Sequence, residues 1–184
     1  MKRYWGDIKP MDYLRTGFFV AAAFYFFAGN LAFTWKFFLA WILIMVVRWL
    51  QVPVWLELGF MIAGIFQVLG NNLELFQHYT YYDKLVHFTL PVFSGPLMYL
   101  LLVKNRIFEP NASQPKWGWQ IFYVTAFTAI TAAVLWEIVE FTVEREFHIP
   151  LQHGNTDTMT DLITSLLGAI TGGYLAVLSK LGLK

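Results

Sequence analysis

Hydrophobic positions along the chain gather into six long runs, separated by polar, glycine and proline residues. The runs cover about residues 13–29, 33–51, 54–77, 83–104, 117–142 and 157–180. A helix needs roughly 20 apolar residues to cross about 30 Å of bilayer hydrocarbon, and each run is close to that length. The pattern therefore predicts an all-α, polytopic transmembrane helical bundle of about six helices, with residues 1–184 forming a single membrane-embedded domain.

The first two runs are separated only by a short break near Gly29 and Asn30. Both residue types favour turns, so we expect a helical hairpin here rather than one long helix. A bundle of five spans is the alternative. The polar segments 105–116 and 145–156 are the clearest loops, and they separate the last three runs.

Composition also indicates a membrane protein, because 58% of the 184 residues are hydrophobic and only 14% are charged. A soluble domain could not bury so much apolar surface, so the expected surroundings are the lipid bilayer. The net charge of +1 argues against a nucleic-acid partner, which would need a clustered basic face. Without cysteine, the chain has no disulfide, no catalytic thiolate and no cysteine zinc site.

Basic residues predict the orientation, because the short cytoplasmic loops of membrane proteins are rich in Lys and Arg. With six spans, Lys36, Lys84 and Arg145 fall on one side, and the other basic residues fall on the side of the termini. The latter are Lys2, Arg3, Lys9, Arg15, Arg48, Lys104, Arg106, Lys116, Lys180 and Lys184. We therefore predict a multi-pass protein of the cell (inner) membrane with both termini in the cytoplasm. The outer side then holds most of the acids and every histidine, namely His78, His87, His148 and His153.

Three pairs of ionisable residues mark the outer ends of the last three expected helices. The pairs are Asp83 with His87, Glu137 with Glu140, and Asp157 with Asp161. Spacings of three or four residues place both members of a pair on one helical face. Counted at about 1.5 Å per residue from the inner ends, the three pairs fall near one level. His87, Glu137 and Asp161 lie about one turn deeper than their partners, where an unpaired charge costs several kcal/mol.

Two prolines affect the fourth expected helix. Pro91 has no N–H to donate to the carbonyl of His87, and Pro96 likewise cannot donate to Val92. We therefore expect a bend in the first half of this helix, and a carbonyl at His87 that is free for another partner.

In the sixth run, Gly168 and Gly172 form a small-xxx-small spacing that Ser165 extends. Such a spacing lets another helix approach closely, so it predicts a packing surface rather than a chemical site.

Each ionisable pair also has a structural interpretation. Asp83 and Asp157 are suitable helix N-caps, and a lone histidine such as His87 is more often a hydrogen-bonded core residue than a metal ligand. The glutamates late in the fifth run are harder to explain, because acids at a helix C-terminus oppose the helix dipole. Lys84 either neutralises one of the acids or extends to the headgroups.

The ordered motifs DKLVHF, an acid pair late in the next helix, and DTMTDLITSLLGAITGG resemble the YjdF-type family of bacterial inner-membrane proteins. More distantly, they are similar to the VanZ-like family. The resemblance covers about residues 71–174 and implies signature positions, without assigning them an activity. These are Asp83, Lys84, His87, Glu137, Glu140, Asp157 and Asp161. The chain lacks the arginine that VanZ-like proteins carry shortly before the last aspartates, so their link to antibiotic resistance is not transferred.

The first functional hypothesis is a membrane-embedded, metal-dependent enzyme. Its metal ligands would be His87, Glu137, Glu140 and Asp161, and Asp83 or Asp157 would support them or act as the general base. One imidazole among carboxylates suits Mg²⁺, Mn²⁺, Fe²⁺ or Zn²⁺. At the outer interface, a metal-activated water could attack a phosphoryl or ester group of a lipid or lipid-linked substrate.

Two other functions are open. A transporter or ion carrier would use intramembrane carboxylates, but it should have polar groups across the membrane. The inner halves of the last three runs contain almost none, and Gln67 is a lone candidate at mid-depth. In the third hypothesis the polar cluster joins the helices of a non-catalytic membrane scaffold or recruits a partner.

Overall fold

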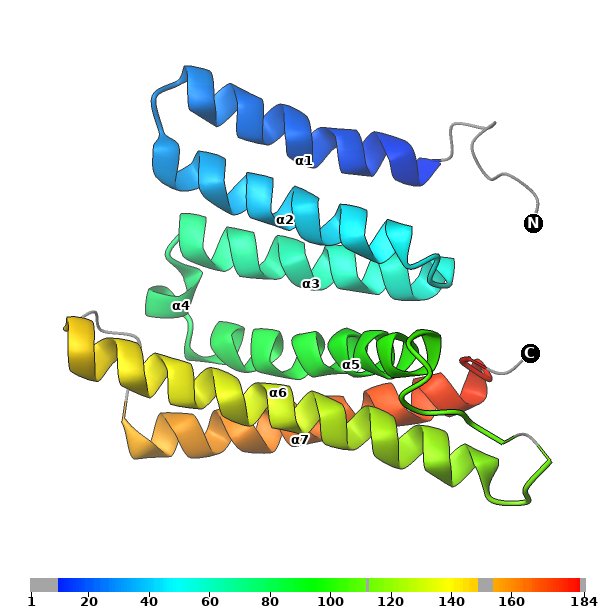
Figure 1. Cartoon of the computed structure of the whole chain (residues 1–184). Coiled ribbons are helices and arrows are strands. Elements are labelled where there is room, and N and C mark those ends of the chain that lie inside the picture. The colour runs from blue at the N-terminus through cyan, green and yellow to red at the C-terminus, as the bar shows by residue number, and fades with distance from the viewer. Residues whose placement is uncertain (1–9, 112, 149–153, 183–184) are drawn as a thin grey trace. The chain divides into compact units, whose positions relative to one another are not determined.

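The computed structural model describes residues 10–111, 113–148 and 154–182, and every element in these ranges is a helix (Figure 1). The helices are α1 (Pro10–Phe27), α2 (Leu31–Trp49), α3 (Val54–Asn72), α4 (Leu75–His78), α5 (Thr80–Lys104), α6 (Trp117–Phe147) and α7 (Asn155–Leu178). Apart from the four-residue α4, they have at least 18 residues each. The prediction of an all-α helical membrane bundle is confirmed. Lys2, Arg3, Lys9, His153 and Lys184 lie outside the described residues.

Helix boundaries differ from the sequence pattern mainly in the third run. The run extends to residue 77, but α3 ends at Asn72, and Glu74 takes a left-handed φ of 54° before α4 begins. Gly70 and the two asparagines after it are poor helix formers, which accounts for the early end of α3.

Three helices among the described residues are long and apolar enough to cross a membrane. They are Tyr81–Lys104, Trp117–Phe147 and Asn155–Leu178. The apolar part of α3, Val54–Gly70, is shorter. That α1, α2 and α3 also cross the membrane stays a prediction.

The chain divides into two compact units, Met1–Gln51 and Val52–Lys184. In the first unit α1 and α2 form the expected hairpin, with a positive φ of 75° at Gly29. The side chain of Asn30 caps α2 by accepting a hydrogen bond from the Phe33 N–H. Asp12 of α1 pairs with Arg48 of α2 and so ties the two helices together. The assignment of residues 1–184 to one domain stays a prediction.

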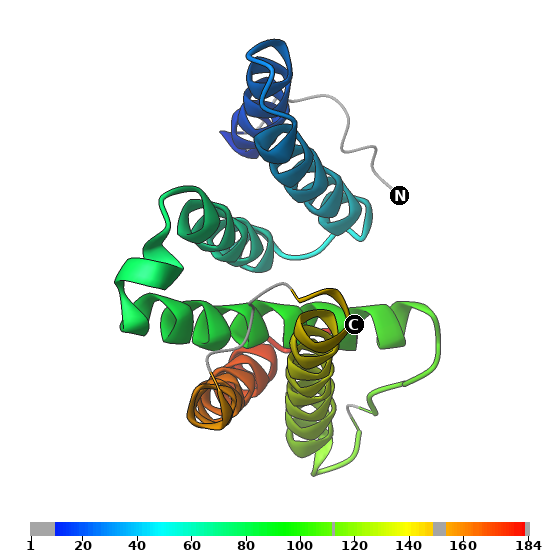
Figure 2. The same cartoon turned by 90° about the vertical axis from the view of Figure 1, so that its left-hand side faces the viewer.

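In the second unit α5 packs against α7, α6 and α3, and α6 also packs against α7. Figure 2 shows α5 crossing α6 and α7 obliquely. The hydrophobic core lies where α3 and α6 begin and α5 and α7 end. Its buried residues are Leu56, Tyr99, Leu100, Ile121, Ala176 and Leu181. This apolar end of the unit is opposite the end that holds the ionisable pairs.

The expected close approach at the glycines of α7 is confirmed, and the partner is α5. A Cβ atom at Gly168 would lie 2.2 Å from the Phe88 carbonyl oxygen, and one at Gly172 would lie 2.7 Å from that of Val92. Only residues without a side chain allow two backbones to come this close. This contact fixes the middle of α7 against the middle of α5.

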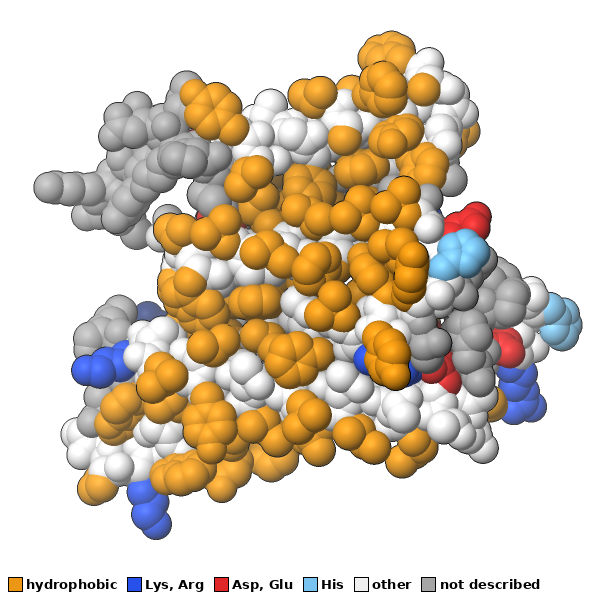
Figure 3. Space-filling view, turned by 180° about the vertical axis from the view of Figure 1, so that it is seen from behind, with side chains coloured by type: hydrophobic (Ala, Val, Ile, Leu, Met, Phe, Trp, Pro, Cys, Tyr) orange, Lys and Arg blue, Asp and Glu red, His pale blue; other side chains and the backbone are white. Residues whose placement is uncertain are grey.

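The outer surface of the second unit is strongly apolar. On α6, Trp119, Tyr123 and Phe127 are exposed and form a ladder of stacked rings. On the face seen in Figure 3, hydrophobic side chains cover the middle of the helices, and acidic and histidine side chains lie toward one end. A broad exposed apolar belt is expected for helices whose solvent is lipid.

Candidate functional site

Polar side chains from three helices meet at one end of the second unit, which we call the site end. They come from the first two turns of α5, the later part of α6 and the first two turns of α7. The residues are Asp83, Lys84, His87, Glu137, Asp157 and Asp161. The prediction that the pairs on these helices lie at one level is confirmed for these residues by the distances between their side chains.

The site end lies nearly one hydrocarbon thickness from the opposite end. Along α6, Glu137 is about 30 Å from Trp117, and along α7, Asp161 is about 26 Å from Leu178, at the helical rise of 1.5 Å per residue. The hydrocarbon layer is about 30 Å thick. These lengths agree with the prediction that the cluster lies near one boundary between hydrocarbon and headgroups.

Lys84 is the centre of an ion-pair network. Its Nζ donates hydrogen bonds to Oδ1 of Asp157 and Oδ1 of Asp161, both at 2.6 Å, and to Oδ2 of Asp83 at 3.0 Å. An ammonium group has three N–H donors, so these carboxylates satisfy all of them. Of the two interpretations of Lys84, the structure supports neutralisation of the acids.

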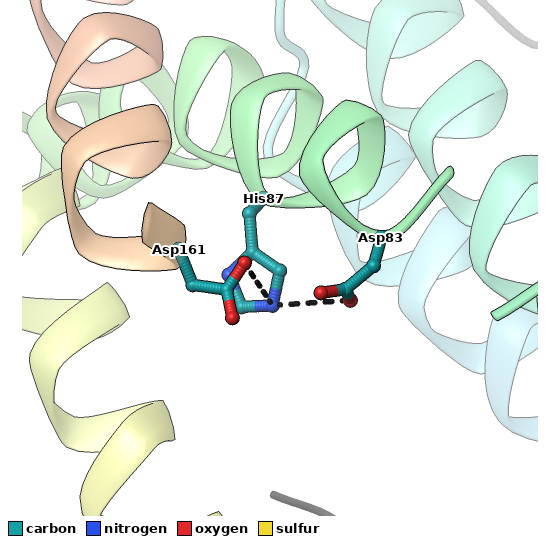
Figure 4. A group of neighbouring side chains, drawn as sticks. All are labelled: Asp83, His87 and Asp161. Carbon is teal, nitrogen blue, oxygen red and sulfur yellow. Dashed lines mark ion pairs between the residues drawn. The ribbon is translucent and has the colours of Figure 1, made fainter. Parts of the chain in front are cut away.

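His87 lies between three carboxylates. Its Nε2 is 3.5 Å from Asp83 Oδ1 and 3.9 Å from Asp161 Oδ1, on the two sides of the ring shown in Figure 4. Its Nδ1 is 3.8 Å from Glu137 Oε1. These distances exceed those of a hydrogen bond, which are at most about 3.2 Å. Two ligands of one ion, each about 2.1 Å from it, are about 3 to 4 Å apart.

The ligand atoms of Asp83, His87 and Asp161 all lie within 4.8 Å of one another. One oxygen from each aspartate and one nitrogen from the histidine could thus reach a common metal ion after small side-chain movements.

Glu137 is the most unusual residue of the cluster. Its side chain is 6% exposed, and both carboxylate oxygens are buried without a hydrogen-bond partner among the described residues. Burying a carboxylate in this way costs several kcal/mol unless a nearby group compensates it. The Nδ1 atom of His87 lies 3.8 Å from Glu137 Oε1 and can serve as such a group.

Burial follows the depth predicted from sequence. The side chain of His87 is 12% exposed and that of Asp83 is 26% exposed. On α7, Asp161 is 3% exposed and Asp157 is 22% exposed. In each pair the deeper residue is the more buried one.

The carbonyl that Pro91 leaves without a donor has found another partner. The Oγ of Ser165 on α7 donates a hydrogen bond to the His87 carbonyl oxygen at 3.1 Å. The position of Pro91 predicts the free carbonyl, whereas the spacing of Ser165 predicts only a packing role. This bond joins α7 to α5 at the histidine itself.

Glu140 is positioned differently from Glu137. Its Oε1 accepts a hydrogen bond at 2.8 Å from Nε1 of Trp136 on the same helix. Glu140 is not in the group of residues whose ligand atoms converge, which contains Asp83, His87 and Asp161.

The N-cap interpretation of Asp83 and Asp157 is wrong. The N-cap residue of α5 is Tyr79 and that of α7 is Gly154, so both aspartates lie inside the first turn of their helices. They still complement the positive end of the helix dipole, and their carboxylates bind Lys84.

Comparisons with known proteins agree with a membrane protein. A protein of Thermotoga maritima described as uncharacterized is 31% identical over 116 residues, which are 62% of this chain and 57% of that protein. The chain thus spans little more than half the length of this relative. No solved structure matches the chain. The family described as "Predicted membrane protein (DUF2238)" matches residues 13–180. Because this match covers most of the chain, the protein belongs to that family of membrane proteins.

Proposed function

We propose that this protein binds one divalent metal ion at the outer face of the cell membrane and uses it to act on a lipid or lipid-linked substrate. Asp83, His87 and Asp161 are the protein ligands. The observation that carries the proposal is the position of His87. Its Nε2 faces two aspartate oxygens, and its Nδ1 faces the buried carboxylate of Glu137, which has no hydrogen-bond partner in the described part of the chain.

A metal bound to Nε2 explains the role of Glu137. Metal-bound histidines usually donate their other ring N–H to a carboxylate or carbonyl, which fixes the tautomer and the direction of the ring. His87 Nδ1 lies 3.8 Å from Glu137 Oε1, and a small rotation of a side chain would bring the two atoms to the distance of such a hydrogen bond. Glu137 is then the residue that orients His87, rather than the direct ligand that the sequence suggested.

The types of ligand atom favour some metal ions over others. One imidazole nitrogen and two carboxylates suit Mn²⁺, Fe²⁺ or Zn²⁺ better than Mg²⁺, which prefers oxygen ligands and bound water. Three protein ligands leave coordination positions for water and substrate, as in catalytic metal sites.

The location of the cluster supports a lipid substrate. Headgroup depth is the predicted position of the cluster, and Asp83 and Asp157 are the more exposed members of their pairs. A metal-bound water would attack a phosphoryl or ester group there, and Asp157 would take up its proton.

A transport path is less well supported. At the opposite end of the unit, a buried cluster of apolar side chains and Tyr99 joins α3, α5, α6 and α7, and Glu57, which follows Leu56 of this cluster in the sequence, is also buried at the start of α3. Such a predominantly apolar core does not favour a polar route across the membrane. The YjdF-type and VanZ-like resemblances agree with a location in the inner membrane, but they do not contribute to the choice of function.

The binding part of the proposal can be tested with the full chain purified in detergent. The protein should bind Mn²⁺ tightly, and His87→Ala should abolish tight binding. Glu137→Gln should weaken it about 10–100-fold, the usual effect of removing a carboxylate that orients a metal-bound histidine. Glu140→Gln is the matched control and should have a much smaller effect. Equal effects of the two glutamine variants would contradict the assigned roles.

The catalytic part needs reconstituted protein. Liposomes of mixed phospholipids carrying the protein should show a new lipid product by mass spectrometry when Mn²⁺ is present. Liposomes with the His87→Ala variant should not. A lipid profile that is identical for the two proteins would count against an enzyme acting on these lipids.

A further inference from the structure

The carboxylates of Asp83 and Asp161 each lie beside two separate positions that a cation can occupy. The first position lies beside His87 Nε2, which is 3.5 Å from Asp83 Oδ1 and 3.9 Å from Asp161 Oδ1. The second is held by Lys84 Nζ, which is 3.0 Å from Asp83 Oδ2 and 2.6 Å from Asp161 Oδ1. Two carboxylates shared in this way resemble the bridging ligands of a two-metal site.

The second position has a carboxylate of its own. Asp157 Oδ1 lies 2.6 Å from Lys84 Nζ and completes the set of three aspartates around the ammonium group. Three carboxylate oxygens from two helices surround Lys84 as they would surround a small cation.

The charges of the cluster are not balanced by Lys84 alone. Asp83, Asp157, Asp161 and Glu137 carry four formal negative charges against one positive charge, which leaves an excess of three. Glu137 is 6% exposed and its oxygens have no hydrogen-bond partner among the described residues, so part of this excess is buried. One divalent ion beside His87 would reduce the excess to one.

We propose that the ammonium group of Lys84 is a permanent second cation of this centre. This inference rests on the proposed function and deepens it. The site therefore binds one divalent ion and not two, and a neutral residue at position 84 opens a second metal position. In two-metal enzymes the paired ions lie about 3.5–4 Å apart and stabilise the attacking and leaving oxygens. Here a metal ion and an ammonium group divide that task, which suits a substrate with a phosphoryl or ester group.

The test is the number of Mn²⁺ ions bound per chain, measured by equilibrium dialysis and elemental analysis of the full chain in detergent. The wild type and the charge-conserving Lys84→Arg variant should each bind one ion. Lys84→Met, which keeps an unbranched side chain of nearly the same length but removes its charge, should bind two. The two ions should also give the exchange-coupled electron paramagnetic resonance spectrum of neighbouring Mn²⁺, where the wild type gives six lines.

A second pair of variants keeps the test valid if Lys84→Met fails to fold. Asp157→Asn removes a carboxylate of the lysine position and should change the Mn²⁺ affinity less than about threefold, whereas Asp161→Asn removes a shared carboxylate and should weaken binding at least about tenfold. Equal losses in these two variants would overturn the separation into two positions.

The outcomes distinguish this inference from the proposed function. A wild type with one ion and a Lys84→Met variant that also binds one would overturn only the role of Lys84. Binding of two ions by the wild type would also overturn the role of Lys84. A wild type without bound metal would overturn both proposals.

Discussion

At the scale of single residues, the His87 carbonyl shows how a local rule of backbone chemistry produces a contact between helices. Pro91 cannot donate to this carbonyl, and Ser165 of α7 supplies the missing hydrogen bond. The sequence predicts that this carbonyl lacks a donor within its own helix, because this follows from the position of one proline. It does not predict the donor, because the distance between Ser165 and His87 depends on how α5 and α7 pack.

Replacement of Ser165 by Ala should lower the free energy of unfolding by about 1 kcal/mol, because the carbonyl then has no donor. In a Pro91→Ala background, the alanine N–H can bond to the same carbonyl within α5. The Ser165→Ala substitution should then cost less than half as much as in the wild type. Thermal unfolding of the four proteins in detergent measures both costs. Equal costs in the two backgrounds would show that Ser165 stabilises α7 in some other way.

The site residues, too, are predicted by the sequence only as far as their contacts do not depend on how the helices pack. Spacing along each helix places Asp83 with His87 and Asp157 with Asp161, and the structure brings these pairs together. Spacing along the helix cannot show which of Glu137 and Glu140 belongs to the site, because both lie in the same turn of α6. The rotation of α6 about its axis decides that Glu137 is buried beside His87, while Glu140 bonds to Trp136. It is also tertiary packing that makes Lys84 bind three aspartates.

At the scale of helices, the contact between α5 and α7 positions the site. Gly168 lies about two turns after Asp161 on α7, and its Cα meets the backbone of α5 at Phe88, next to His87. The small-xxx-small pattern predicts such a contact, although it does not say which helix is the partner. The early end of α3 is harder to predict, because apolar residues continue after Gly70 and the two asparagines and so extend the predicted run past Glu74.

A side chain at Gly168 should separate the two helices. The Cβ of Gly168→Ala would lie 2.2 Å from the Phe88 carbonyl oxygen, so the backbones must move apart. We expect a loss of about 1–3 kcal/mol in stability. Gly64→Ala in α3 is the matched control, because no atom of another described element lies within 4 Å of its new Cβ, and helix propensity there favours alanine. The two alanine variants can be compared by thermal unfolding in detergent, and equal stability would contradict the close contact.

At the scale of the whole molecule, the position of the site relative to the cell follows from the distribution of charge. The charge rule places the site end outside the cytoplasm, together with the end of α6 at Phe147. This orientation is a prediction from the sequence.

Single cysteines test this orientation, because the natural chain has none. A cysteine at Glu146, whose side chain is exposed, should react with a membrane-impermeant maleimide added to intact cells. A cysteine at Arg106, in the loop after α5, should react only after the cells are opened. The reverse pattern would place the site at the cytoplasmic face and would redirect the search for its substrate.

The central claim is that one metal ion is bound through Nε2 of His87, and pulsed electron paramagnetic resonance of the Mn²⁺-loaded full chain tests it most directly. The spectrum should show coupling of the ion to one imidazole nitrogen, and this coupling should be absent in His87→Ala. Bound Mn²⁺ without nitrogen coupling, or a coupling that persists in His87→Ala, would contradict the account.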